Sequence, residues 1–182
     1  MQLFASLELP PAPRAALARW GAAAGAADPA LRAVDAPALH LTLHFLGERP
    51  DAELDALRAA VAVVPDAPVP LTGTSALWFA PRRPHVLAAG FASPGGGLAA
   101  LHAGLGRALA AAAPGWSPDV RPFRPHVTVA RVRRGARPRQ EAVAPPPRLR
   151  FDAAAVVLLE SVLSPSGARY ATLEHRALRT GA

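Results

Sequence analysis

The tetrapeptide His-hydrophobic-Thr-hydrophobic occurs twice in this chain, at residues 40–43 and at residues 126–129. Both copies lie in short β-like runs, and residues two apart on a strand project from the same face. Each copy therefore presents one imidazole and one hydroxyl together and turns its apolar residues toward a core. Two such strands lying side by side would form a pocket with two imidazoles and two hydroxyls, which suits phosphoester chemistry without a metal.

The rest of the chain predicts alternating strands and helices. The two halves share a loose order of strand, helix and motif strand, which predicts an α+β fold of two lobes that each lend one motif strand to a shared cleft. We expect a single domain, residues 1–182, with lobes at about 1–90 and 91–182 that allow strand exchange. The expected strands are 2–9, 31–34, 39–46, 69–79, 85–91, 127–132, 150–163 and 168–175, the helices 14–24, 51–64 and 98–113, an exposed loop 133–147 and a turn 164–167.

Charge is distributed unevenly over the 182 residues. The formal net charge is +7, and every basic residue is arginine. Residues 1–100 carry 7 arginines against 8 acidic residues, whereas residues 101–182 carry 13 against 5. The second half is therefore expected to face an anion, and the forked guanidinium is well suited to phosphate.

Residue types that are absent restrict the chemistry. The chain has no cysteine, so disulfides, thiolate catalysis and cysteine-based zinc sites are excluded. The sequence also lacks the carboxylate clusters that hold Mg²⁺ or Mn²⁺ in nucleases, so we expect no metal and no other cofactor. The first residues do not resemble a signal peptide, and the apolar run 153–159 is too short to span a membrane. We expect a cytoplasmic monomer with no membrane contact and no obligate protein partner.

The paired motifs favour general acid–base catalysis. Histidine, with an unperturbed pKa of about 6.5, donates or accepts a proton near neutrality. Hydrolysis of a phosphodiester needs one proton taken from water and one given to the departing oxygen, so two imidazoles on opposite sides of the phosphorus meet the need. The threonine hydroxyls can donate hydrogen bonds to the non-bridging oxygens. A cyclic phosphate fits best, because its strained ring reacts without a metal.

The other histidines and nearby aromatic residues have plainer interpretations. Strict alternation places His44 on the face of His40, but a strand separates the two by roughly 13 Å, too far for one zinc ion. We therefore expect His44 at the cleft rim or on a polar surface.

We expect His85 and His175 on the surface and His102 in a structural role. Trp78 and Phe79 are open to two interpretations, base stacking or core packing.

Three longer segments resemble a known family. They are LHLTLHFLGE at 39–48, RPFRPHVTVARV at 121–132 and LLESVLSPSGARY at 158–170. They are similar to the two-histidine (2H) phosphoesterases, in particular the RNA 2′,3′-cyclic phosphodiesterases, also called 2′-5′ RNA ligase-like proteins. The segments LFASLELP near the N-terminus and APRRPHVLAAGF at 80–91 extend the resemblance over nearly the whole chain. It implies a bilobal fold of two pseudo-symmetric antiparallel sheets, with helices outside and the active site in a central cleft.

The resemblance also implies a reaction and roles for five residues. The substrate would be an RNA 3′ end bearing a 2′,3′-cyclic phosphate, opened to a 2′-phosphomonoester. His40 would be the proton donor to the leaving 3′ oxygen and His126 the proton acceptor for water. Thr42, Thr128 and Arg131 would hold the phosphate. Strict alternation puts Arg131 on the opposite face from His126, so the strand must twist or end there.

Alternative functions stay open at this point. The same chemistry could act on small cyclic nucleotides or ADP-ribose cyclic phosphate, or perform reversible 2′-5′ RNA ligation. A non-enzymatic RNA-binding module that uses the basic half is a different class of protein. It predicts salt-sensitive binding that is indifferent to the end group of the RNA, and it leaves the paired motifs without a role.

Overall fold

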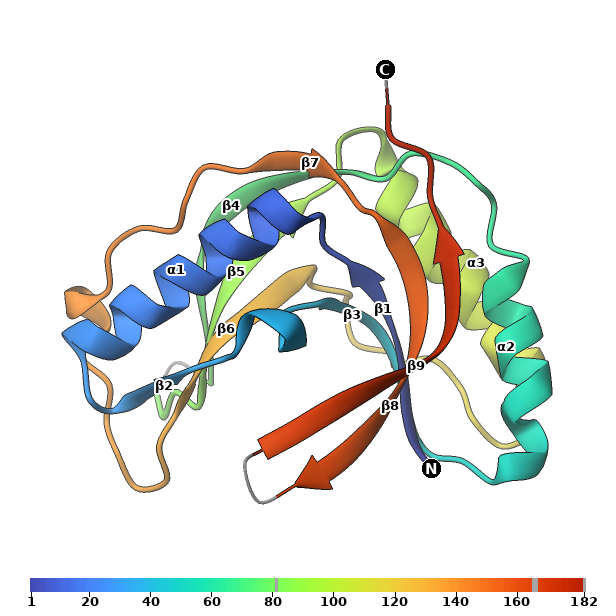
Figure 1. The fold of residues 1–182 in the computed structure, drawn as a ribbon, viewed down its shortest axis with the longest axis horizontal. Helices are drawn as coiled ribbons and strands as arrows, with labels where there is room; N and C mark the ends of the chain where they lie inside the picture. Colours follow the sequence, from blue (N-terminus) through green and yellow to red (C-terminus); the bar gives the residue numbers. More distant parts are fainter. Residues whose placement is uncertain (81, 165–166, 182) are drawn as a thin grey trace.

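The computed structural model describes residues 1–80, 82–164 and 167–181. Within these residues the chain forms nine strands and three α-helices, joined in places by short 3₁₀ turns (Figure 1). The strands are β1 (Gln2–Glu8), β2 (Leu31–Ala33), β3 (Leu41–Glu48), β4 (Pro70–Phe79), β5 (Val86–Ala92), β6 (His126–Val132), β7 (Arg150–Asp152), β8 (Ala155–Ser164) and β9 (Gly167–Ala177). The helices are α1 (Pro11–Ala27), α2 (Leu54–Ala62) and α3 (Gly97–Ala112).

The strands pair in the order β7-β4-β5-β6-β3-β1-β8-β9, and every pair is antiparallel. Strand β2 lies outside this order and pairs with β6, also antiparallel. The predicted α+β class with antiparallel strands is confirmed. The two expected sheets are halves of one continuous sheet, because the motif strands β3 and β6 pair at Leu41 and Val127 and join them. Each half of the sheet contains strands from both the first and the second half of the sequence.

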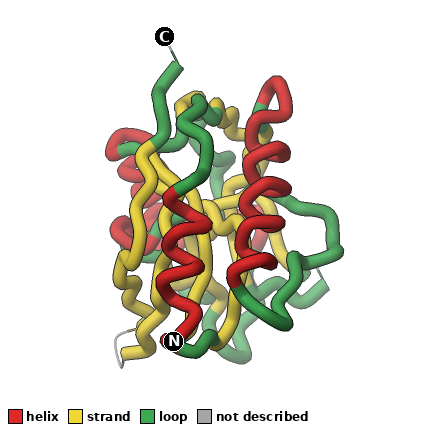
Figure 2. Tube along the Cα trace, turned by 90° about the vertical axis from the view of Figure 1, so that its right-hand side faces the viewer, coloured by secondary structure: helices red, strands yellow, loops and turns green. Residues whose placement is uncertain are grey.

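The helices pack against one core. In α1 the side chains of Leu17 and Trp20 are buried, and the helix lies against β2 and β6. Helices α2 and α3 lie side by side, as Figure 2 shows, and they pack over the half of the sheet that contains β3, β8 and β9. Apolar residues of all three helices belong to one buried cluster with Leu41 and Val127. The residues next to these two in each strand therefore project from the opposite face of the sheet.

The single strand expected at residues 150–163 is two strands. Strand β7 pairs with β4 in one half of the sheet, whereas β8 pairs with β1 in the other. The exchange occurs between neighbouring residues: the Ala153 amide donates to the Val69 carbonyl at 3.0 Å, and the Ala154 amide donates to the Glu8 carbonyl at 3.0 Å. A continuous apolar run does not reveal such a change of partner.

Smaller differences occur at the other boundaries. The helix expected at 51–64 begins as a 3₁₀ turn, Asp51–Glu53, and continues as α2. The loop 133–147 is mostly exposed but anchored to α1, because the Trp20 indole donates to the Ala144 carbonyl at 2.8 Å. The turn expected at 164–167 lies partly outside the described residues. No helix in the described parts of the chain has the length and apolar character required to cross a membrane.

Candidate active site

The two motifs come together where β3 meets β6. His40 immediately precedes β3, whereas we predicted that the strand begins before it, and His126 is the first residue of β6. Leu41 and Val127 are opposed in an antiparallel pair, so the register sets each motif histidine across from the threonine of the other motif. Each imidazole therefore has a hydroxyl-bearing neighbour on the adjoining strand.

One cavity of about 440 Å³ contains all five predicted site residues. His40, Thr42, His126, Thr128 and Arg131 line it together. The histidines and threonines are partly buried, and the arginine is exposed. The volume lies within the range typical of small-molecule sites. Side chains from both halves of the sheet thus converge on one space.

Both motif imidazoles are held in the same way. His40 Nδ1 donates to the Ala38 carbonyl at 2.8 Å, and His126 Nδ1 donates to the Arg124 carbonyl at 2.7 Å. A carbonyl oxygen only accepts, so each Nδ1 carries a proton. Each Nε2 is therefore the nitrogen left to exchange a proton with a ligand, which is the requirement for a general acid or base.

Two aromatic rings fix the position of His40. The Phe4 ring centroid lies 4.9 Å from the imidazole, and the Tyr170 ring lies 5.1 Å away in an edge-on arrangement. Phe4 and Tyr170 also contact each other, at 5.1 Å. Sequence reasoning did not select either residue, because they come from β1 and β9 and neither has a distinctive local pattern.

A different ring packs against His126. The Phe79 ring centroid lies 4.5 Å from this imidazole. The Arg124 guanidinium lies over the Phe79 ring, 5.5 Å from its centroid. Phe79 is half-buried and packs against a site histidine, which differs from the expected core packing, and stacking of a base on it stays a prediction. Trp78 packs against the buried core.

Burial lowers the pKa of both site histidines. For His40 the pKa falls to about 4, mainly because burial disfavours the charged ring and secondarily because the Arg131 and His126 charges repel it. The bond to Ala38 opposes that fall. Burial also lowers the pKa of His126. In the ligand-free cavity His40 is therefore neutral at pH 7, and a bound anion would be needed to favour its charged form.

A β-bulge brings Arg131 to the cavity. Consecutive residues of β5 pair with Ala130 and Thr128, so Val129 is an extra residue in β6. Val129 and Ala130 are both fully buried. Alternation is interrupted there, and Arg131 returns to the face of His126. We expected that the strand must twist or end for Arg131 to share a face with His126, and the bulge at Val129 is the irregularity that allows it.

A matching bulge in β3 corrects the placement of His44. Consecutive residues of β1 pair with Thr42 and His44, so Leu43 is extra, and both Leu43 and His44 are buried. His44 therefore lies on the opposite face from His40, not at the cleft rim. Phe45 returns to the cavity face, where it is 72% exposed.

Buried His44 ties β3 to its surroundings. Its Nε2 donates to the His102 carbonyl at 2.9 Å, and its ring stacks on the His102 ring at 4.1 Å. Phe123 stacks on the other side of His102 at 3.9 Å. His102 thus has the structural role that we predicted, and His85 and His175 are exposed as predicted. Among the described residues no group of three His, Asp or Glu side chains is arranged to hold a metal ion.

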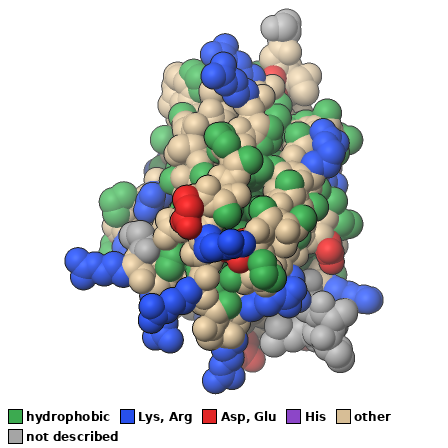
Figure 3. Space-filling view, turned by 90° about the vertical axis from the view of Figure 1, so that its left-hand side faces the viewer, with side chains coloured by type: hydrophobic (Ala, Val, Ile, Leu, Met, Phe, Trp, Pro, Cys, Tyr) green, Lys and Arg blue, Asp and Glu red, His purple; other side chains and the backbone are tan. Residues whose placement is uncertain are grey.

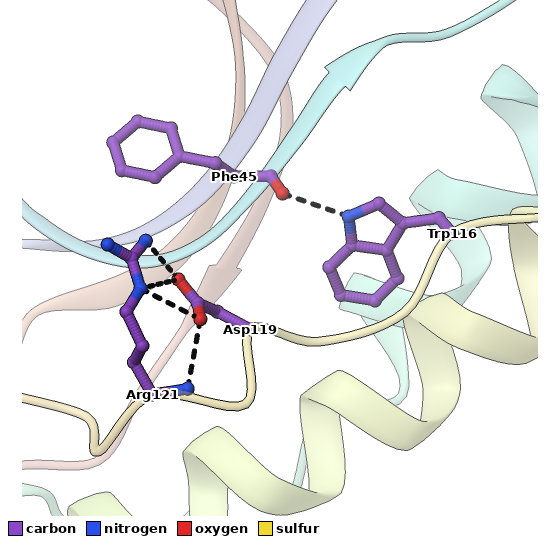
Figure 4. A network of polar contacts seen from close by, with 4 residues as sticks. All are labelled: Phe45, Trp116, Asp119 and Arg121. Carbon is purple, nitrogen blue, oxygen red and sulfur yellow. Dashed lines mark hydrogen bonds and ion pairs between the residues drawn. The ribbon is translucent and has the colours of Figure 1, made fainter.

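The segment before β6 also anchors Phe45. The Trp116 indole donates to the Phe45 carbonyl at 2.9 Å, and the Phe45 ring points away from that indole (Figure 4). In the same segment the Arg121 guanidinium forms an ion pair with Asp119. Sequence reasoning missed Phe45 as a site residue, although its position directly after a motif was an available signal.

Comparisons with known proteins identify a family and several relatives of this chain. Residues 9–163 match the family model described as the 2′-5′ RNA ligase superfamily. A Thermus thermophilus protein named RNA 2′,3′-cyclic phosphodiesterase is 37% identical over 156 residues, which cover 78% of this chain and 72% of that protein. A solved structure from Thermus thermophilus has a TM-score of 0.83 at 32% identity, covering 98% of both chains. E. coli LigT complexed with 3′-AMP has a TM-score of 0.77 at 28% identity, covering 97% of both chains.

Proposed function

Because the chain belongs to the 2′-5′ RNA ligase superfamily, we propose that it hydrolyses the 2′,3′-cyclic phosphate of an RNA end to a 2′-phosphomonoester without a metal. The observation that carries the proposal is the matched pair of imidazoles. Both bond a backbone carbonyl through Nδ1, both line one cavity, and both leave Nε2 for proton transfer. Two threonine hydroxyls adjoin them in the same cavity.

The proposed step divides two proton transfers between the imidazoles. Nε2 of neutral His126 takes a proton from water as the water oxygen bonds to phosphorus. The bond from phosphorus to the 3′ oxygen breaks, and protonated His40 gives its Nε2 proton to that oxygen. Thr42 and Thr128 donate hydrogen bonds to the non-bridging oxygens, where charge accumulates, and Arg131 adds a charge-assisted bond.

The proton donor must be charged when the substrate is bound. Burial and the Arg131 charge keep His40 neutral in the ligand-free cavity. A phosphate anion beside the ring favours the imidazolium and raises the pKa of His40, so the donor acquires its proton as the substrate binds. Substrate binding and activation of the acid are then a single event.

Two features favour an RNA end as the substrate. Phe45 offers an exposed ring beside the phosphate-binding residues, and bases stack on such rings. One relative is named for 2′,3′-cyclic phosphodiesterase activity on RNA, and another was solved with 3′-AMP. Both names concern an RNA end or a nucleotide with a phosphate on the ribose 3′ side.

The test uses an oligonucleotide that ends in a 2′,3′-cyclic phosphate, incubated with the protein and EDTA. We expect a 2′-phosphomonoester as the product. His40→Ala and His126→Ala should each lower kcat by about 10²–10⁴-fold, the usual contribution of a positioned acid or base. His85→Ala, which removes an exposed histidine outside the cavity, should leave the rate unchanged. Full activity in either site variant, or loss of activity with EDTA, would overturn the mechanism.

A further inference from the structure

Arg32 and Arg131 lie directly opposite each other on neighbouring strands. Their Cα atoms are register partners in the pair of β2 with β6, and both exposed side chains line the same cavity. Opposed side chains in an antiparallel pair share a face, with Cβ atoms about 4.5–5.5 Å apart, and like charges there repel. Such an arrangement is stable when an anion offsets the repulsion.

Neither guanidinium is neutralised by a carboxylate within the described residues. Other arginines form ion pairs, such as Arg14 with Glu8, but none of the ion pairs found there includes Arg32 or Arg131. Asp35 lines the same cavity and is not among those ion pairs. Among the residues that the structure describes, the two arginines thus present two guanidinium groups without an ion-pair partner to one space, against the single carboxylate of Asp35.

Arg32 lies level with Arg131 on β6, several residues from the point where the two motif strands pair. The two motifs meet where β3 pairs with β6 at Val127, whereas Arg32 lies on β2, which pairs with the far end of β6. The side of the molecule that carries β2 in Figure 1 is shown in Figure 3, where arginine side chains gather over the lower part. The second arginine of the pair is thus on the strand that lies at this arginine-rich side of the molecule.

We infer that Arg32 binds a second phosphate of the substrate, the one on the 5′ side of the terminal ribose, and that Arg131 contacts both phosphates. The inference rests on the proposed function and specifies its substrate class. A ligand with two phosphates, as at an RNA end, occupies both the motif residues and the arginine pair. A cyclic mononucleotide with no 5′-phosphate occupies the motif residues alone. The arginine pair therefore selects RNA ends over small cyclic nucleotides.

Calorimetric binding of two product-like ligands tests this without turnover. Adenosine 2′,5′-bisphosphate carries the second phosphate, and adenosine 2′-monophosphate does not. We expect the wild-type protein to bind the bisphosphate about tenfold or more tightly, as a charge-assisted contact gives. Arg32→Ala should remove that preference and leave affinity for the monophosphate unchanged. Arg32→Lys keeps the charge and should retain part of the preference.

Arg134→Ala is the matched control, because it removes an exposed arginine just beyond β6 that does not line the cavity. It should keep the wild-type preference. The inference is overturned if the wild-type protein binds both ligands equally, if Arg32→Ala weakens both equally, or if Arg134→Ala acts like Arg32→Ala. Thermal unfolding of each variant verifies that the fold is intact. A failure of the proposed function is distinct: it is the absence of wild-type hydrolysis of a cyclic phosphate end, whatever the binding preference.

Discussion

Phe45 and Arg131 occupy equivalent positions in the two motif strands. Each lies five residues after its motif histidine, each follows a one-residue bulge, and each lines the cavity. The bulges turn two successive residues of each strand into the core, so the next side chain returns to the site. The two motifs are thus alike in backbone and differ in what they offer a ligand, a ring on one side and a cation on the other.

Replacing Phe45 with alanine is expected to weaken substrate binding. Stacking of a base on an aromatic ring contributes about 1–3 kcal/mol, so KM for an RNA end should rise roughly tenfold while kcat changes little. Phe45→Tyr keeps the ring and should behave as wild type. The check is steady-state kinetics on a short oligonucleotide with a terminal cyclic phosphate. An unchanged KM in Phe45→Ala would show that no base rests on this ring.

The sequence predicted the main site residues because a strand with period two is a strong signal. The four motif residues His40, Thr42, His126 and Thr128 line the cavity as the alternation indicates. His44 was misplaced because alternation was extended through a bulge. A bulge depends on the pairing of a strand with its neighbour, and that pairing is not visible in the residues of one strand.

Residues that reach the site from other strands were beyond sequence reasoning for a related reason. Phe4, Tyr170 and Arg32 come from β1, β9 and β2, and only the sheet order brings them to the cavity. The change of partner between Ala153 and Ala154 is equally non-local. Local patterns predicted which segments are strands, whereas tertiary pairing decides which strands are neighbours.

Binding of the product should take up a proton. The pKa of His40 in the free protein is about 4, so the ring is neutral at pH 6. If a bound phosphate raises that pKa, adenosine 2′-monophosphate binds together with a proton. Calorimetry at pH 6 in buffers of different ionisation enthalpy measures the uptake. His40→Gln should take up fewer protons than wild type, and an equal uptake would argue against His40 as the proton donor.

Acid should destabilise the stacked rings of His44, His102 and Phe123. Burial lowers the pKa of His44 and of His102 below the unfolded value of 6.5. Protonation of either ring then favours the unfolded state. The contribution of the two neutral histidines to the free energy of unfolding is complete above pH 6.5, and it is lost as the pH falls toward their pKa values in the folded state. Burial lowers the pKa of His40 and His126 too, which adds a loss of the same sign.

Urea unfolding measured between about pH 7.5 and about pH 5 should show this loss. His44→Gln removes one titrating group and keeps a side-chain donor for the His102 carbonyl, so its unfolding free energy should fall less steeply than that of wild type. His85→Gln changes an exposed histidine and should follow the wild-type slope. Equal slopes in wild type and His44→Gln would mean that His44 is not the source.

Two glycines of α1 offer a matched test of the link between this helix and the bulge in β6. A Cβ on Gly21 would lie 2.6 Å from the Val129 carbonyl oxygen, which accepts a bond from the Val34 amide at 2.8 Å. A Cβ on Gly25 would lie 3.7 Å from the nearest atom, the Leu31 carbonyl oxygen, an ordinary contact. Gly21→Ala must therefore move the helix away from β6 or displace Val129.

Gly21→Ala is expected to destabilise the protein by about 1–3 kcal/mol, the usual effect of overpacking. Gly25→Ala should stabilise it by about 0.5–1 kcal/mol, because alanine favours the helix. Because Val129 separates Thr128 from Arg131, Gly21→Ala should also lower kcat/KM for a cyclic phosphate end, and Gly25→Ala should not. Urea unfolding and steady-state kinetics on both variants measure the two effects. Equal stability in the two variants would mean that α1 does not constrain the bulge, and the approach of Arg131 to the cavity would then depend on the pairing of β6 with β2 and β5.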